Sequence, residues 1–244
     1  MGTSTAARHV AAVSPRLLAR IAGVFEALEG FTSSFGQVVI LGRLVVSGAA
    51  AATAANILAH HRLFWLGFVL SVAGVACHIV WIALFYVLFR PVNRNLSLVA
   101  VLVGVVVCAV QAFTAFLYLA PLLVLEAGKS AVAFTPAQLQ SVAMIVIRLN
   151  GYAFDLDLVF FGLWCALTGY LILRSTFMPR VLGVLLAIDG LGWMMYVVPP
   201  FANHLFPFIA AASGLAEIPL QLWLIIMGVN PERWRQQAGE APAT

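Results

Sequence analysis

Apolar residues gather into six long stretches along the chain, each interrupted by few polar positions. A helix needs around 20 apolar residues to cross the hydrocarbon core of a bilayer. Each stretch is long enough to be a transmembrane helix, and they cover Leu17–Leu41, Leu63–Phe89, Leu96–Leu125, Tyr152–Leu173, Val181–Pro200 and Leu205–Val229. The pattern predicts an all-α fold, an integral membrane bundle of six transmembrane helices that occupies residues 16–230.

Two of the connecting segments also carry helical signals. The alanine-rich segment after the first stretch predicts a short interfacial helix, with Asn56, His60 and His61 at its end. The segment EAGKSAVAFTPAQ predicts a loop and then a helix that starts at Thr135–Pro136, because Thr caps helices and Pro favours their first turn. We expect that helix to run on past Arg148 into the fourth stretch, and we expect the tail GEAPAT to be disordered.

The composition of the chain excludes most other classes of protein. Hydrophobic residues make up 63% of the chain and charged residues 9%, against about 45–50% and 25% in soluble domains. The mean hydropathy is +1.04. A soluble fold of this size has too little interior to bury so much apolar surface. These values exclude a soluble enzyme, a disordered chain and a nucleic-acid-binding domain.

The positions of the basic residues predict how the helices are oriented. Basic residues are enriched in cytoplasmic loops of membrane proteins. If six helices alternate in direction, one side receives Arg43, Arg62, Lys129 and Arg148. The other side receives more than twice as many: Arg8, Arg16, Arg20, Arg90, Arg94, Arg174, Arg180, Arg233 and Arg235. For a protein of the plasma membrane, we therefore expect both ends, residues 1–15 and 231–244, to be cytoplasmic.

Carboxylates inside the apolar stretches are the main chemical signal. Each costs around 2.5–3.5 kcal/mol at a helix centre, so such residues normally face the bundle interior or a water-filled cavity. At 1.5 Å per residue, Glu26, Asp189, Glu217, Glu29 and His78 lie roughly 13–18 Å from the cytoplasmic ends of their helices. These residues and one glutamine form a candidate ligand- or proton-binding layer: Glu26, Glu29, His78, Asp189, Glu217 and Gln221.

A second candidate polar group lies near the outer end of the fourth stretch. It consists of Arg148, Asp155 and Asp157, and the two aspartates point to nearly opposite sides of a helix. For both groups the alternative to ligand binding is a role in helix packing, because polar side chains also hold membrane helices together by hydrogen bonds.

The sequence names no catalytic residue, metal site or cofactor. It contains no HExxH, GxSxG, Walker or GxGxxG motif. Cys77, Cys108 and Cys165 are widely spaced within apolar stretches, which is typical of small buried side chains and not of a disulfide framework.

Several strings resemble the DUF4386 family of bacterial polytopic membrane proteins, which has no assigned function. They are ARIAGVF, AATAANILAHHRLFWLGF, LFRPVNRNLSLVA, FFGLWCALTGYLILRSTFMPRVLGVLLAIDGLGW and LQLWLIIMGVN. One departure is Ala49 after Gly48, where family members often carry an aspartate. The resemblance implies six helices and a bacterial inner membrane, and it supplies neither a substrate nor a catalytic residue.

Three functions remain open on the sequence. The first is binding or transport of a small or lipidic ligand, with or without proton coupling, through the carboxylate and histidine layer. The second is an intramembrane enzyme that acts on a lipid or isoprenoid, with carboxylates and His78 as acid and base. The third is a non-catalytic accessory subunit. The expected partners are membrane lipids; a homodimer is compatible with a carrier of six helices, and nucleic acid is excluded.

Overall fold

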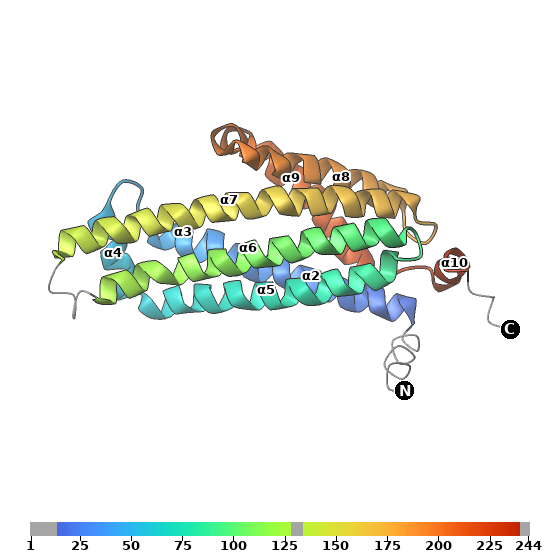
Figure 1. Cartoon of the computed structure of the whole chain (residues 1–244), viewed down its shortest axis with the longest axis horizontal. Coiled ribbons are helices and arrows are strands. Elements are labelled where there is room, and N and C mark those ends of the chain that lie inside the picture. Colours follow the sequence, from blue (N-terminus) through green and yellow to red (C-terminus); the bar gives the residue numbers. More distant parts are fainter. Residues whose placement is uncertain (1–13, 128–133, 240–244) are drawn as a thin grey trace. The chain divides into compact units, whose positions relative to one another are not determined.

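The computed structural model describes residues 14–127 and 134–239, and within these ranges the chain forms helices and no strands. The helices are shown in Figure 1 and follow one another as α2 (Pro15–Ser34), the π-helix η1 (Phe35–Ile40), α3 (Leu41–Leu44), α4 (Ala50–Ala59), α5 (His61–Phe89), α6 (Arg94–Ala127), α7 (Pro136–Arg174), α8 (Arg180–Met194), the 3-10 helix η2 (Met195–Val197), α9 (Pro199–Ile226) and α10 (Pro231–Gln237).

In the described part of the chain, 5 helical segments are long and apolar enough to cross a membrane. They are α5, α6, α7, α8 with η2, and α9, and they match the second to sixth predicted stretches. The protein is therefore an all-helical, multi-pass membrane protein. The first predicted stretch is helical too, but it is divided into α2, η1 and α3. A sixth crossing and the direction of the helices remain predictions.

The predicted helix ends agree closely with the structure. α7 begins at Pro136, and the N–H of Gln138 donates to Thr135 Oγ1 over 3.3 Å, so Thr135 caps the helix. α7 then continues without a break to Arg174. The alanine-rich segment forms α4, and its C-cap is His60. The predicted loop that contains Lys129 and the predicted disordered tail lie largely outside the described residues.

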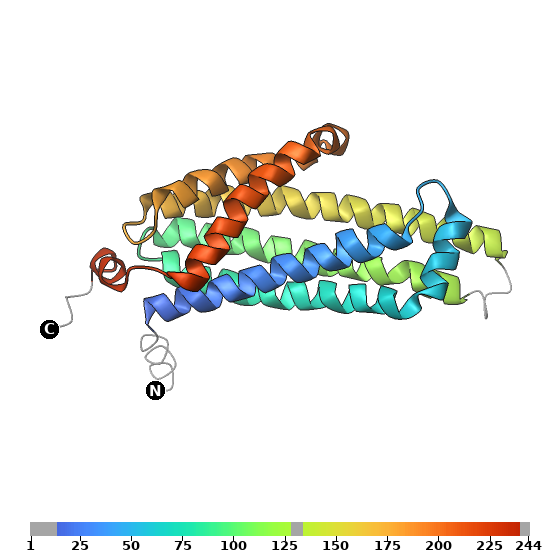
Figure 2. The same cartoon turned by 180° about the vertical axis from the view of Figure 1, so that it is seen from behind.

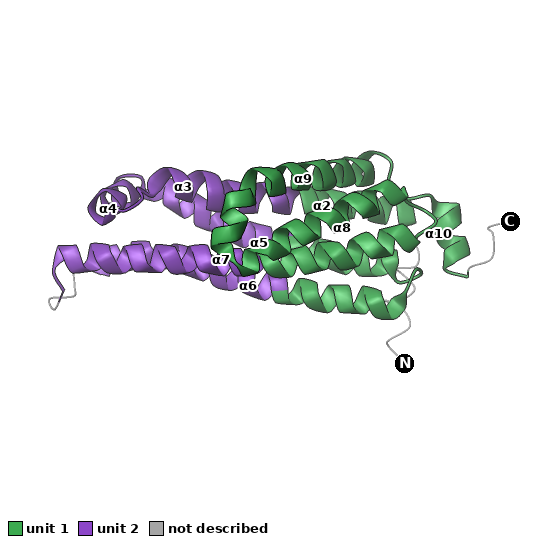
Figure 3. Cartoon of the chain, turned by 90° about the horizontal axis from the view of Figure 1, so that it is seen from above, with its two compact units in different colours: residues 1–27, 78–106, 158–244 green, residues 28–77, 107–157 purple. Residues whose placement is uncertain are grey.

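The chain divides into two compact units, coloured separately in Figure 3. Unit 1 comprises residues 1–27, 78–106 and 158–244, and unit 2 comprises residues 28–77 and 107–157. Four helices, α2, α5, α6 and α7, contribute one part to each unit.

Unit 1 is held together by helices that approach closely at glycines. A Cβ atom on Gly169 of α7 would lie 2.8 Å from two backbone atoms of α8, Gly183 O and Ala187 N. A Cβ atom on Gly23 of α2 would lie 2.7 Å from Leu224 Cβ of α9, and Figure 2 shows the last turns of α9 beside the first turns of α2. Small residues allow this contact, which replaces hydrophobic burial as the source of helix association in lipid.

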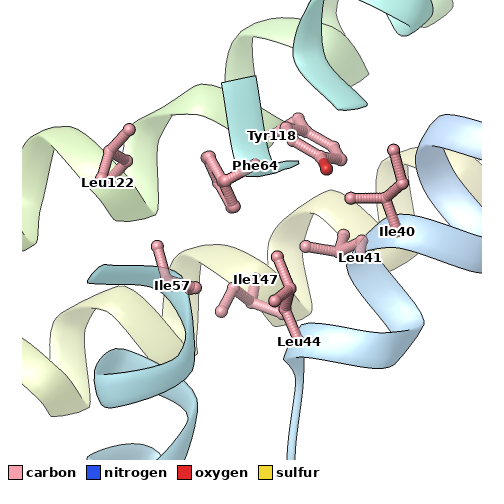
Figure 4. Packing of buried hydrophobic residues seen from close by; sticks show 8 residues of the cluster. All are labelled: Ile40, Leu41, Leu44, Ile57, Phe64, Tyr118, Leu122 and Ile147. Atoms are coloured by element: carbon pink, nitrogen blue, oxygen red, sulfur yellow. The ribbon is translucent and has the colours of Figure 1, made fainter. Parts of the chain in front are cut away.

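Unit 2 has an apolar core built from α4 and the ends of its longer helices. The core is shown in Figure 4, where the ring of Tyr118 lies beside that of Phe64 with centroids 4.8 Å apart. The cluster consists of Ile40, Leu41, Leu44, Ile57, Phe64, Tyr118, Leu122 and Ile147. This core fixes α3 and α4 against α5, α6 and α7 within the unit.

Candidate functional site

Unit 2 contains a buried polar cluster centred on Glu29. The Oε1 atom of Glu29 accepts a hydrogen bond of 3.0 Å from Ser33 Oγ and one of 3.1 Å from Gln111 Nε2. Asp157 interacts with both Glu29 and Gln111. Glu29 is 7% exposed and Asp157 is 4% exposed, so both carboxyl groups lie inside the unit. α2 supplies Glu29 and Ser33, while α6 supplies Gln111 and α7 supplies Asp157.

A small cavity lies against this cluster. Its volume is about 20 Å³, and it is lined by Ser33, Gln37, Ser71, Gln111, Thr114, Phe154 and Asp157. A cavity needs roughly 10–15 Å³ and several polar partners to hold one water molecule. This one is thus large enough for a water molecule or a bare cation, and too small for an organic ligand.

The hydroxyl groups that line the cavity donate their hydrogens to atoms outside it. Ser71 Oγ donates to Gly67 O over 2.9 Å, and Thr114 Oγ1 donates to Val110 O over 2.9 Å. Ser33 Oγ donates to Glu29. The Oδ1 atom of Asp157 is buried and has no hydrogen-bond partner in the described part of the chain. These hydroxyl groups and Asp157 Oδ1 therefore present oxygen lone pairs to the cavity, and such atoms bind a hydrogen-bond donor or a cation.

The backbone near the cavity is shaped by the π-helix and by glycines. In η1 the N–H of Leu41 donates to Gly36 O, a bond over five residues that marks a widened turn. Such turns are rare in helices and are frequent at functional sites. A Cβ atom on Gly36 would lie 2.8 Å from Gly67 O of α5, so glycine is needed where η1 passes α5. Gln37, the next residue, lines the cavity.

Unit 1 contains a separate group of carboxyls. Asp189 of α8 is fully buried, and it interacts with Glu217 of α9, the Cys165 thiol and the Trp193 indole. Glu217 Oε1 accepts hydrogen bonds from Ser213 Oγ over 2.8 Å and from Trp193 Nε1 over 3.3 Å. Two neighbouring carboxyls in a low-dielectric environment are able to share one proton.

Glu26 and His78 also lie in unit 1. Glu26 is 6% exposed and acts electrostatically on the same Cys165 thiol as Asp189 and Glu217. His78 is fully buried and stacks on Trp81 with ring centroids 4.6 Å apart. The edge of Phe161 packs against the same histidine at 6.5 Å. His78 is therefore part of an aromatic cluster between α5 and α7.

The sequence-derived candidates thus fall into two groups. Glu29 lies in unit 2 with Asp157, whereas Glu26, His78, Asp189, Glu217 and Gln221 belong to unit 1. Gln221 is half-buried in α9, one turn after Glu217. Of the predicted outer group, Arg148 is exposed, Asp155 is half-buried and Asp157 is buried. No group of three His, Cys, Asp or Glu side chains within residues 14–127 and 134–239 could hold a metal ion.

Sequence reasoning missed the uncharged members of the cavity. Gln111 donates directly to Glu29, and Ser33, Gln37, Ser71 and Thr114 line the same space. The signal was present in part, because Gln111 is a lone amide within the apolar stretch 96–125. Serine and threonine carry little such signal, since they bond to their own helix backbone in many transmembrane helices.

Comparisons with known proteins identify the family and no activity. Over 143 residues the chain is 27% identical to an uncharacterised protein of Archaeoglobus fulgidus, a match that covers 59% of this chain and 72% of the relative. No solved structure matches. The family model described as a domain of unknown function, DUF4386, matches residues 21–228. The chain therefore belongs to the DUF4386 family.

Proposed function

We propose that this protein binds a small cation inside the membrane and moves it from one side to the other. The cation is either a proton, carried by water, or a small monovalent ion. The observation that carries the proposal is the cavity of about 20 Å³ beside Asp157, whose Oδ1 atom has no hydrogen-bond partner among the described residues. We further propose that the membrane is a bacterial plasma membrane and that the helices number six, with both chain ends in the cytoplasm.

Charge and hydrogen bonding both support a positively charged occupant. Glu29 and Asp157 are close enough to interact, and no basic side chain lines the cavity. In a low-dielectric interior, two carboxyls together disfavour double ionisation unless a proton or cation joins them. Gln111 contacts both carboxyls, so it holds them at a fixed separation.

The size of the cavity distinguishes between the classes of ligand that are compatible with the sequence. A drug-sized or lipid-sized ligand occupies roughly 300–1,000 Å³, whereas this cavity holds one water-sized particle. The site in unit 2 therefore favours a proton or an ion over a lipid chain.

Reconstituted liposomes test the proposal with two probes. Proton entry is followed with a pH-sensitive dye trapped inside, and sodium entry is followed with radioactive Na⁺. We expect the wild-type protein to accelerate the flux of one of the two, and Asp157→Asn to reduce that flux at least about tenfold, because an intramembrane carboxyl that binds the ion is replaced by a neutral amide.

The matched control is Asp155→Asn. Asp155 lies two residues away on α7, is half-buried and does not line the cavity. It should retain nearly wild-type flux. Equal fluxes in Asp157→Asn, Asp155→Asn and the wild type would contradict the proposal, as would wild-type liposomes that behave like empty ones for both probes.

A further inference from the structure

Unit 1 carries a basic groove where α10 lies beside the turn between α7 and α8. The groove has a volume of about 710 Å³ and is lined by Ser175, Thr176, Met178, Arg180, Arg233, Gln236 and Gln237. Its lining includes two arginines and no acidic residue. We infer that this groove binds the phosphate group of an anionic phospholipid at the membrane surface.

The groove lies where three transmembrane helices of unit 1 end. α7 ends at Arg174, α8 begins at Arg180 and α9 ends at Ile226. The N–H of Asn230, which follows α9, donates to Phe177 O over 3.3 Å, so the two segments leave the bilayer next to each other. Lipid headgroups occupy this level of a membrane.

The walls of the groove are fixed by hydrogen bonds between α10 and the rest of the unit. Trp234 is buried, and its Nε1 donates to Leu88 O over 2.8 Å. Gln237 Oε1 accepts from both the backbone N–H and the hydroxyl of Thr176, at 2.9 and 3.0 Å. A preformed wall does not have to become ordered when a ligand binds, which lowers the entropic cost of binding.

The two guanidinium groups provide the recognition chemistry. Arg180 and Arg233 are both exposed, and Arg233 Nη1 makes a long contact of 3.4 Å with Thr176 O. That geometry leaves most of its five N–H donors free for a ligand. Guanidinium groups bind phosphate oxygens through paired hydrogen bonds, and Arg is enriched where this recognition is needed. The volume of about 710 Å³ falls within the roughly 300–1,000 Å³ that is typical of pockets for organic ligands, and it greatly exceeds that of a single anion.

Native mass spectrometry of the full chain in detergent tests the inference. The probes are phosphatidylglycerol, phosphatidylcholine and inorganic phosphate. We expect the wild-type protein to retain phosphatidylglycerol about tenfold more tightly than phosphatidylcholine, since basic residues near a membrane surface favour anionic lipid. The double variant Arg180→Gln/Arg233→Gln should lose this preference, and Arg180→Lys/Arg233→Lys should keep part of it.

The matched control is Arg43→Gln/Arg62→Gln, which removes two exposed arginines of unit 2. It should keep the wild-type preference, and thermal unfolding should show that all the variants are folded. Loss of the preference in this control, or its persistence in Arg180→Gln/Arg233→Gln, would overturn the inference. Arginine-dependent binding of inorganic phosphate without a preference for phosphatidylglycerol would also overturn it, because the ligand would then be a free anion.

Discussion

The amide of Gln111 donates a hydrogen bond of 3.1 Å to Glu29 Oε1, although the two residues are 82 positions apart in the chain. The bond joins α2 to α6 within unit 2, and Gln111 also contacts Asp157 of α7. One uncharged side chain therefore links the two carboxyls of the proposed ion site. This link also stabilises the fold, because a buried carboxyl that loses its hydrogen-bond donor raises the free energy of the folded protein.

We predict that Gln111→Leu lowers the free energy of unfolding by about 1–3 kcal/mol, since it leaves a buried carboxyl oxygen without its hydrogen-bond donor. The same substitution in a Glu29→Gln background should cost less. Thermal unfolding of the wild type, both single variants and the double variant measures the coupling. Purely additive changes would show that the bond contributes nothing.

Close packing of α7 on α8 gives a second prediction. Gly169→Ala places a methyl group 2.8 Å from backbone atoms of Gly183 and Ala187, which cannot move aside without separating the helices. Overpacking of this kind costs about 1–3 kcal/mol. Gly151→Ala is the control in the same helix, because nothing lies within 4 Å of its Cβ position. A thermal shift assay should show destabilisation for Gly169→Ala alone, and similar melting temperatures for both variants would be inconsistent with the close approach.

The buried hydroxyl group of Tyr118 gives a third prediction. Tyr118 is 1% exposed, and its Oη atom has no hydrogen-bond partner within the described residues. We predict that Tyr118→Phe stabilises the protein by about 1 kcal/mol, because it removes a buried unsatisfied hydroxyl and keeps the ring. Tyr118→Ala should instead destabilise it by about 3–5 kcal/mol, since it leaves a cavity in the core of unit 2. Chemical denaturation in detergent compares the two, and a loss of stability in Tyr118→Phe would mean that the hydroxyl has a partner.

The predicted direction of the helices is tested by labelling. Ser47 and Gln236 are exposed, and they lie on the predicted outer and cytoplasmic sides. We expect Ser47→Cys to react with a membrane-impermeant maleimide in intact cells, and Gln236→Cys to react only after the cells are opened. The wild-type chain measures the background from the native cysteines. The reverse pattern of labelling would place both ends of the chain outside.

The local sequence predicts most of the helices. It predicts only some of the residues that form the candidate site. The apolar stretches are long enough to predict α5 to α9 directly, and Thr135–Pro136 predicts the start of α7. Glu29 and Asp157 stand out because charge is rare in such stretches. Counting residues along each helix assigns Glu29 and Asp157 to different predicted groups, although the two interact in the structure, because such a count does not show which helices face each other.

The apolar runs alone specify a helical membrane protein, because such uninterrupted runs have no other stable state in lipid and their backbone bonds are satisfied within each helix. Packing between helices, and not the local sequence, brings Glu29 to Gln111 and Asp157 in one unit and Asp189 to Glu217 in the other. Those contacts depend on which residues let two helices approach closely and on which helix faces then meet. Both are properties of packing between segments that are distant in the sequence, and no local pattern encodes them.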